Sequence, residues 1–170
     1  MKRVTAVAMM VTMLLSVVFG SAGCKNPNKE WYKGALEYYG NGIKNGFGEE
    51  LSNLHVAKDL KKPGNKCGYL LRDLDGDGID ELLIGLIDDG IETKFTSVVV
   101  RHSGLGPYCL LSGGDGYYIY LCSNNVLRVD SWYGSATKKE YMQFDHKSNA
   151  FTIIDGEGKY LPMKWELTAF

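Results

Sequence analysis

From residue 67 to residue 170, short apolar or aromatic runs alternate with turns rich in glycine and asparagine. Runs of this length between such turns are typical of β-strands joined by hairpins. Strands that follow one another through short turns pair antiparallel, which predicts a meander sheet. The runs that we expect to form strands are 68–72, 82–87, 97–101, 108–111, 117–122, 126–130, 140–145, 150–154 and 164–170.

The segment before these runs has a helical pattern. Residues 29–39 repeat apolar side chains at helical spacing, with Asn28 placed as the amino-terminal cap and Gly40 placed to end the helix. Residues 49–60 carry a weaker apolar stripe of the same kind. We therefore expect two helices before the first strand.

Length and composition fit one globular domain. The chain has 170 residues, of which 45% are hydrophobic and 23% charged, so it is not of the disordered class. A formal net charge of -1 argues against a nucleic-acid partner, which calls for a basic surface. The fold class that we expect is α+β to mainly β. It is a single domain over 29–170, in which N-terminal helices (29–60) pack on an antiparallel meander sheet (67–170).

The amino terminus has the features of a secretory signal. Lys2 and Arg3 precede an uncharged, mostly apolar stretch, residues 6–19, and small residues follow at 20–23. This order of positive charge, apolar core and small residues is typical of a cleaved export signal. The apolar stretch is shorter than the ~18 residues of a transmembrane helix. We therefore expect 1–23 to be a signal peptide.

The sequence Ser21-Ala22-Gly23-Cys24 resembles the cleavage region of bacterial lipoproteins, although that family usually has leucine where Ser21 stands. The resemblance implies that Cys24 receives acyl chains and becomes the mature amino terminus, with 24–28 as a tether. It also implies an exported protein anchored on the extracytoplasmic side of a bacterial membrane. Two or three acyl chains hold a protein firmly on a bilayer. The alternative is an ordinary signal cut nearby, with Cys24 a plain thiol.

The strongest chemical signal is Asp-Leu-Asp-Gly-Asp-Gly-Ile-Asp-Glu at residues 73–81. Three carboxylates stand at alternate positions, and the glycine after them permits a sharp turn. A hard divalent cation such as Ca²⁺ takes about six to eight oxygen ligands, and a tight loop of this pattern supplies several of them. The ligands that we predict are Asp73, Asp75, Asp77, the backbone carbonyl of Ile79, and Glu81. The alternative is an acidic turn that binds no ion.

This segment resembles the calcium loop of the FG-GAP repeats of integrin-type propellers, in which a strand follows the acidic loop directly. The five predicted ligands match that pattern, although the family more often has aspartate where Glu81 stands. A single acidic loop of this kind also resembles those of small exported bacterial lipoproteins of unassigned role. An EF-hand fits less well because its closing glutamate would fall at Ile84.

The remaining cysteines are Cys67, Cys109 and Cys122. Cys109 and Cys122 fall in runs on either side of 112–116 and could face each other as a disulfide, which an exported protein permits. Buried reduced thiols are the equal alternative. No spacing of cysteine and histidine indicates a zinc site.

The chain has no recognised catalytic motif, and His55, His102 and His146 are scattered as ordinary surface or turn residues. We therefore expect a binding or accessory module of the cell envelope, with an envelope protein or a glycan as its partner. The alternative is a cell-wall or carbohydrate hydrolase whose acids lie outside recognised motifs. A cleft with paired carboxylates would favour the hydrolase.

Overall fold

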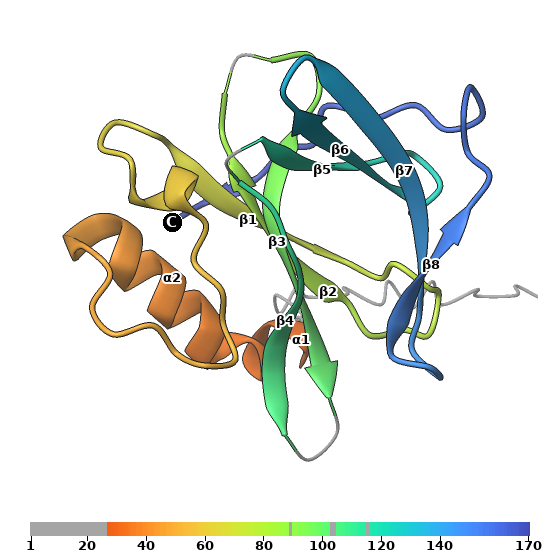
Figure 1. Cartoon of the computed structure of the whole chain (residues 1–170). Coiled ribbons are helices and arrows are strands. Elements are labelled where there is room, and N and C mark those ends of the chain that lie inside the picture. Colours follow the sequence, from red (N-terminus) through yellow and green to blue (C-terminus); the bar gives the residue numbers. More distant parts are fainter. Residues whose placement is uncertain (1–26, 89, 103–104, 115) are drawn as a thin grey trace, which may run out of the picture.

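The computed structural model describes residues 27–88, 90–102, 105–114 and 116–170. The predicted signal 1–23 and the predicted lipidation site Cys24 lie outside the described residues. The body of the protein is one antiparallel sheet (Figure 1). Its strands are β1 (Cys67–Arg72), β2 (Glu81–Leu86), β3 (Lys94–His102), β4 (Gly106–Ser112), β5 (Tyr117–Leu121), β6 (Leu127–Tyr133), β7 (Ala136–Asp145), β8 (Ala150–Ile154) and β9 (Thr168–Ala169).

The strand order is β8-β7-β6-β5-β3-β2-β1-β9, with β4 off this path and paired to β3. Two meanders therefore meet at β3, which pairs with β4 over most of its length and with β5 through Phe95 and Ile119. The predominantly antiparallel sheet is confirmed, and each predicted strand overlaps an observed one. The simple meander breaks after β4, because β5 pairs with β3 instead of with β4.

Within the described residues the helices are few and short: α1 (Pro27–Trp31), α2 (Lys33–Asn45) and a single 3₁₀ turn, η1 (Lys58–Lys61). Gly40 does not end the first predicted helix, because α2 continues to Asn45. No helix in the described part of the chain is long and apolar enough to cross a membrane.

The second predicted helix, 49–60, is wrong except for the 3₁₀ turn near its end. The physical reason is a tertiary contact made by Asn53. Its carbonyl accepts the backbone N–H of Cys109 at 2.7 Å, and its side-chain amide donates to the carbonyl of Pro107 at 2.8 Å. These bonds to β4 replace the backbone bonds of a helix. They prevail because intrinsic helix propensities differ between ordinary residues by only roughly a few tenths of a kcal/mol.

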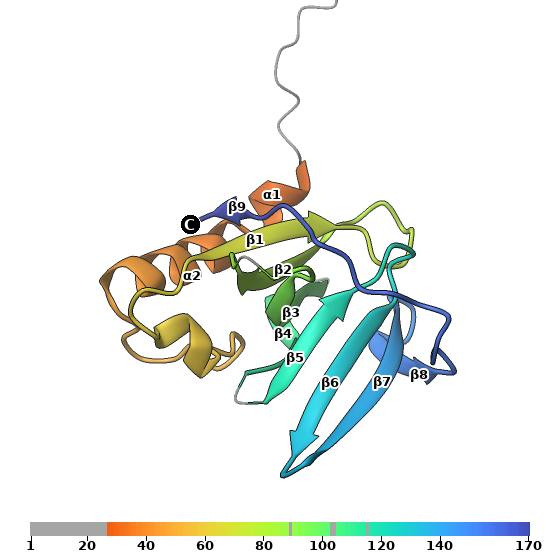
Figure 2. The ribbon, with the colours of Figure 1, turned by 90° about the horizontal axis from the view of Figure 1, so that it is seen from above.

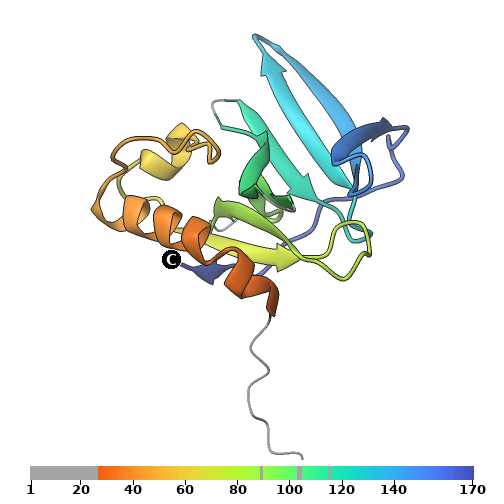
Figure 3. The ribbon, with the colours of Figure 1, turned by 90° about the horizontal axis from the view of Figure 1, so that it is seen from below.

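Strands β2 and β3 are buried on both faces over much of their length, which explains why the runs 82–84 and 98–100 are apolar without alternation. One face contributes to a cluster with side chains of α2 and of the residue before it, which includes Tyr32, Ala35, Tyr39, Leu82, Ile84 and Val99. The other face contributes to a cluster within the curved sheet that includes Leu83, Phe95, Val98, Val100, Ile119, Leu127 and Phe144. Figures 2 and 3 show α2 running beside β1.

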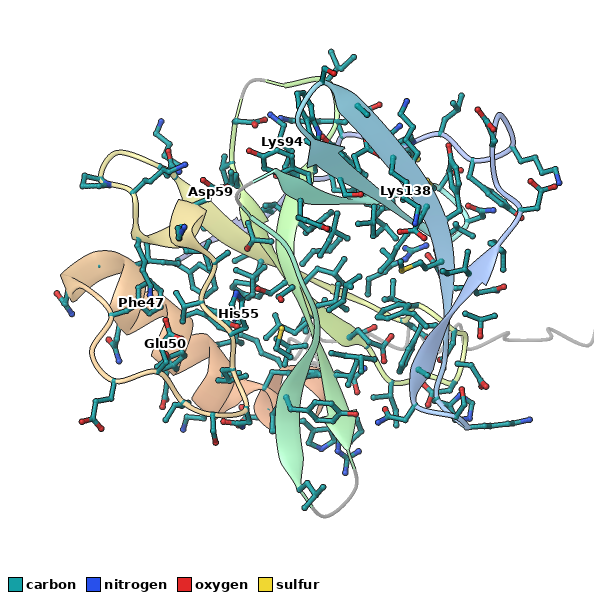
Figure 4. All side chains as sticks on the ribbon, in the orientation of Figure 1. Phe47, Glu50, His55, Asp59, Lys94 and Lys138 are labelled. Carbon is teal, nitrogen blue, oxygen red and sulfur yellow. The ribbon has the colours of Figure 1, made fainter. Side chains whose placement is uncertain are left out.

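The connection from α2 to β1 lies on the same side of the molecule as the helix, as the labelled side chains of Phe47, Glu50, His55 and Asp59 show (Figure 4). The hydroxyl of Tyr39 donates to the carbonyl of His55 at 2.7 Å. Asp59 is buried and forms a salt bridge with Lys62. The connection is therefore held by specific contacts, although most of it has no regular secondary structure.

Cys67, Cys109 and Cys122 are free thiols. Cys109 lies opposite Val99 of β3, whereas Cys122 forms an isolated bridge with Pro162. Of the two alternatives for Cys109 and Cys122, the described structure has the free thiols, and the strands before and after 112–116 do not pair with each other.

Candidate metal centre

The acidic loop is the connection of the β1–β2 hairpin. Arg72 and Glu81 are paired across the two strands, so residues 73–80 must reverse the chain between them. Gly76 and Gly78 have φ values of 80° and 87°, a backbone region in which residues other than glycine are strained. These two glycines allow the loop to curl tightly at the end of the sheet.

Asp73 organises the interior of the loop. One of its oxygens accepts the backbone N–H groups of Gly76 at 2.7 Å and Asp77 at 3.2 Å, and the other accepts that of Gly78 at 2.9 Å. Asp77 in turn accepts the N–H of Ile79 at 2.7 Å. Side chains of alternate residues therefore point inward, as the spacing of the acids predicts.

Glu81 closes the loop from inside the protein. It is 4% exposed, and its Oε2 accepts the backbone N–H of buried Leu74 at 2.9 Å. Burial raises the pKa of Glu81 to about 8, and the charges of Asp75 and Asp77 add to this rise. Among the described residues no basic side chain forms a salt bridge with it. A buried carboxylate in this situation is stabilised by a cation.

The acids form two overlapping groups in which the ligand atoms all lie within 4.8 Å of one another. One group is Asp73, Asp75 and Glu81, and the other is Asp75, Asp77 and His146. Oxygens bound to one divalent cation at about 2.3–2.6 Å cannot lie much farther apart than this. Either group could hold a metal ion, and Asp75 belongs to both.

His146 is a potential ligand that sequence reasoning missed. It lies in the turn between β7 and β8, which Figure 1 shows beside the acidic loop. Its backbone N–H donates to Oδ2 of Asp75 at 2.8 Å, and its ring Nδ1 lies 2.8 Å from the same oxygen. No local signal marks His146, because the contact depends on how the sheet curves.

The turn that carries His146 is fixed by Asp145. The carboxylate of Asp145 accepts the N–H of Lys147 at 3.1 Å and the hydroxyl of Ser148 at 2.8 Å. The bond from Ser148, followed by that from Lys147, lowers the pKa of Asp145. Asn149, with φ of 52°, completes the turn. Asp145 therefore acts as the positioning residue for His146.

A second turn holds the start of the acidic loop. The side-chain amide of Asn125, between β5 and β6, donates to the carbonyl of Asp73 at 2.7 Å. Its oxygen accepts Nε of Arg72 at 2.8 Å. The loop is thus held by one turn at its first residue and by another at Asp75.

The structure brings together four of the five predicted ligands. Asp73, Asp75, Asp77 and Glu81 each belong to a group. The fifth, the carbonyl of Ile79, stays a prediction. Asp80, which alternation would direct into solvent, is half-buried instead and belongs to neither group.

A pocket of about 260 Å³ opens beside the loop. The acidic residues Asp77 and Glu81 and the basic residues Arg101, His146 and Lys147 are among those that line it. The pocket therefore combines acidic and basic residues next to the candidate metal centre.

Chemically, the loop offers oxygen ligands from one hairpin and an imidazole from another. Neither group contains a thiol, so the donors suit a hard or borderline divalent cation better than a soft one. Comparison of the chain with protein-family models, with curated proteins and with solved structures found no match in any of the three.

Proposed function

We propose that this protein is an exported bacterial lipoprotein, anchored through acyl chains on Cys24, whose β-sheet body binds Ca²⁺ in the loop Asp73–Glu81. Its role is that of a binding or accessory module at the cell envelope. The anchor follows from the resemblance of Ser21-Ala22-Gly23-Cys24 to lipoprotein signals. The ion site follows from the loop, which resembles an FG-GAP calcium loop.

The observation that carries the ion site is the position of Glu81. Its carboxylate is buried, has no salt bridge among the described residues, and lies within 4.8 Å of ligand oxygens of Asp73 and Asp75. Burying a charge without a partner is costly, and a divalent cation removes that cost. The same cation relieves the repulsion between the three carboxylates.

The donors favour Ca²⁺ over other common ions. Oxygen ligands suit Ca²⁺, Mg²⁺ and Mn²⁺, whereas thiolate and imidazole sets suit zinc and copper. The flexible coordination of Ca²⁺ fits a short hairpin loop better than the strict octahedron of Mg²⁺ does. The ion would tie the end of β1 to the start of β2, which is a structural role.

The hydrolase alternative requires a cleft with two carboxylates that are free for chemistry. In the described structure, the acids that line the pocket beside the loop are Asp77 and Glu81. Both belong to the groups that could hold the ion. This observation favours a binding module over a hydrolase.

The ion site is tested by calcium-dependent thermal unfolding. A solvent-facing extracellular site has a dissociation constant of order 10⁻⁴–10⁻³ M. Calcium at about ten times that constant stabilises the folded state by about 1.4 kcal/mol. For a domain of this size the expected rise in Tm is roughly 3–6 °C. Asp75→Asn should abolish the rise, whereas Asp80→Asn, which removes the same charge from the same loop, should largely retain it.

A Tm that responds neither to calcium nor to chelator would mean that the loop is an acidic turn without an ion. Mg²⁺ and Mn²⁺ at the same concentrations identify the preferred ion. A larger rise with either of them would replace Ca²⁺ in the proposal.

The anchor is tested separately by partition into detergent. The protein expressed with its own amino terminus should enter the detergent phase, and Cys24→Ser should leave the precursor unlipidated and in the aqueous phase. If the variant still partitions with detergent, the lipoprotein assignment fails. This outcome has no bearing on the ion site.

A further inference from the structure

The pocket beside the acidic loop contains basic side chains without acidic partners. Within residues 27–88, 90–102, 105–114 and 116–170, neither Arg101 nor Lys147 forms a salt bridge, although both line the pocket. Arg101 comes from the end of β3, and Lys147 comes from the turn between β7 and β8. Two elements that are distant in the sequence therefore place positive charge on the same cavity.

Arg101 is held in position by an aromatic contact. Its guanidinium carbon lies 3.8 Å from the ring centroid of Trp31, which belongs to α1 and is 37% exposed. Stacking on an indole orients a guanidinium but leaves its N–H groups available in the plane. A planar fork of donors matches a carboxylate, which accepts two parallel bonds from it.

The remaining surfaces of the pocket also suit a small organic anion. Phe144 and Ile79 add apolar contacts, and Asn149 adds an amide. The volume, about 260 Å³, is enough for a small acid or for the acidic end of a larger molecule. Asp77 and Glu81 line the same pocket, so an anion that enters the ion-free pocket meets repulsion from the acidic loop.

We propose that the pocket binds a carboxylate group together with the ion, with Arg101 and Lys147 contacting the carboxylate and the ion neutralising the loop beside it. This inference rests on the proposed calcium site. The ion adds two positive charges next to Asp77 and Glu81, which reduces the repulsion. One oxygen of the carboxylate is then able to take a coordination position that water would otherwise fill. Calcium and the carboxylate therefore bind with positive coupling.

The coupling is reciprocal, so it is measurable from the calcium side. Calcium is titrated into the purified protein by isothermal titration calorimetry, with free calcium corrected for binding to the added acid. The probes are acetate, N-acetylglutamate and galacturonate, and acetamide is the uncharged control. N-acetylglutamate represents an acidic peptide side chain, and galacturonate represents an acidic glycan, so their relative strength identifies the source of the carboxylate.

At saturating carboxylate the apparent calcium affinity should rise about fivefold or more, which is the usual range of coupling between sites. Acetamide should leave it unchanged. Arg101→Gln and Lys147→Gln should each reduce the rise to less than about twofold, because each removes a charge that contacts the acid. Calcium binding without carboxylate should persist in both variants. Lys139→Gln, which removes an exposed charge from β7, is the matched control and should retain the full coupling.

Normal calcium binding that no carboxylate affects would overturn this inference and leave the proposed function intact. The same holds if acetamide matches acetate, or if coupling survives in both Arg101→Gln and Lys147→Gln. Absence of calcium binding under all conditions would overturn the proposed function and this inference together.

Discussion

His146 and Asp75 are 71 residues apart in the sequence, yet two groups of His146 contact the same carboxylate oxygen. The backbone N–H and the ring Nδ1 both lie 2.8 Å from Oδ2 of Asp75. The ring donates to this oxygen in the tautomer that carries a proton on Nδ1, which leaves Nε2 as the ring nitrogen that could bind a metal ion. The β7–β8 turn is thus joined to the β1–β2 loop by a side chain and by the backbone.

His146→Ala should weaken the ion-free protein modestly. The change removes the bond from the ring but keeps the backbone N–H bond to Asp75. Because the ring is half-exposed, we expect a loss of about 0.5–1 kcal/mol in the free energy of unfolding. Urea denaturation in chelator measures it. His55→Ala is the control, since His55 is exposed and its hydrogen bond with Tyr39 uses the backbone carbonyl. Equal losses in the two variants would contradict a role for the ring.

Glu81→Gln should have opposite effects with and without calcium. The amide oxygen is still able to accept the N–H of Leu74, but the side chain no longer has a proton to take up or a charge to offer to an ion. In chelator near neutral pH the variant should be more stable than the wild type by about 1–2 kcal/mol, because Glu81, with its pKa raised to about 8, must take up a proton on folding, whereas the amide is neutral in both states. In calcium the variant should lose most of the ion-dependent rise in Tm. A variant that is less stable in chelator would show that the glutamate charge is already compensated without an ion.

Asp130→Ala should be strongly destabilising. Arg128 is 8% exposed and forms salt bridges with both Asp130 and Glu92. Its Cζ lies 4.5 Å from the ring centroid of Tyr120. Removing Asp130 leaves a buried cation with one partner, at a cost of about 3 kcal/mol. For a domain of this size Tm should fall by roughly 6–12 °C. Glu92→Ala is the comparison variant and should cost less, because Glu92 is more exposed. Equal losses would mean that both acids contribute alike.

The free cysteines should react slowly in the folded protein. Burial is the largest cause that raises the thiol pKa of Cys67, Cys109 and Cys122, so little thiolate is present near neutral pH. We expect iodoacetamide to modify all three rapidly after unfolding but only slowly before it, as measured by mass spectrometry. A non-reduced peptide map that contains linked Cys109 and Cys122 would contradict the free-thiol structure.

The same pKa shifts predict the response to alkaline pH. A raised thiol pKa means that the folded state keeps its proton longer than the unfolded state, whose thiols titrate near about 8.5. The stabilisation is complete below that pH and is lost as the pH rises through the higher pKa values of the folded state. The urea midpoint should therefore fall above about pH 9. Cys122→Ala should reduce this fall, and an unchanged pH profile would argue against burial of the thiol.

The sequence predicted the strands well because turn residues and apolar runs are local signals. It predicted the loop because carboxylates at alternate positions have a direct chemical meaning. The helix over 49–60 failed because a long-range contact of Asn53 with β4 outweighs a weak helical pattern. Local propensity decides a structure only where tertiary contacts do not oppose it.

The site itself could be predicted only in part. The ligands within one loop follow from their spacing, but the positions of His146, Arg101 and Lys147 beside that loop depend on the curvature of the whole sheet. The pairing of β5 with β3, through Phe95 and Ile119, determines where the later strands lie. That pairing is not a feature of any local segment, so spacing could not reveal it.

In the described structure, the β7–β8 turn and the β1–β2 loop meet without strand pairing between them. We call this contact the seam of the curved sheet. The hydrogen-bonded path extends from β8 at one end to β9 at the other, and the β7–β8 turn meets the acidic loop through the bonds of His146 to the Asp75 side chain. Separating this seam breaks fewer hydrogen bonds than unfolding a strand pair does. Behind it lies the apolar cluster that contains Leu74 and Phe144. Calcium in the loop would thus govern how often the interior opens to water, and amide hydrogen exchange in β7 and β8 would slow as calcium rises.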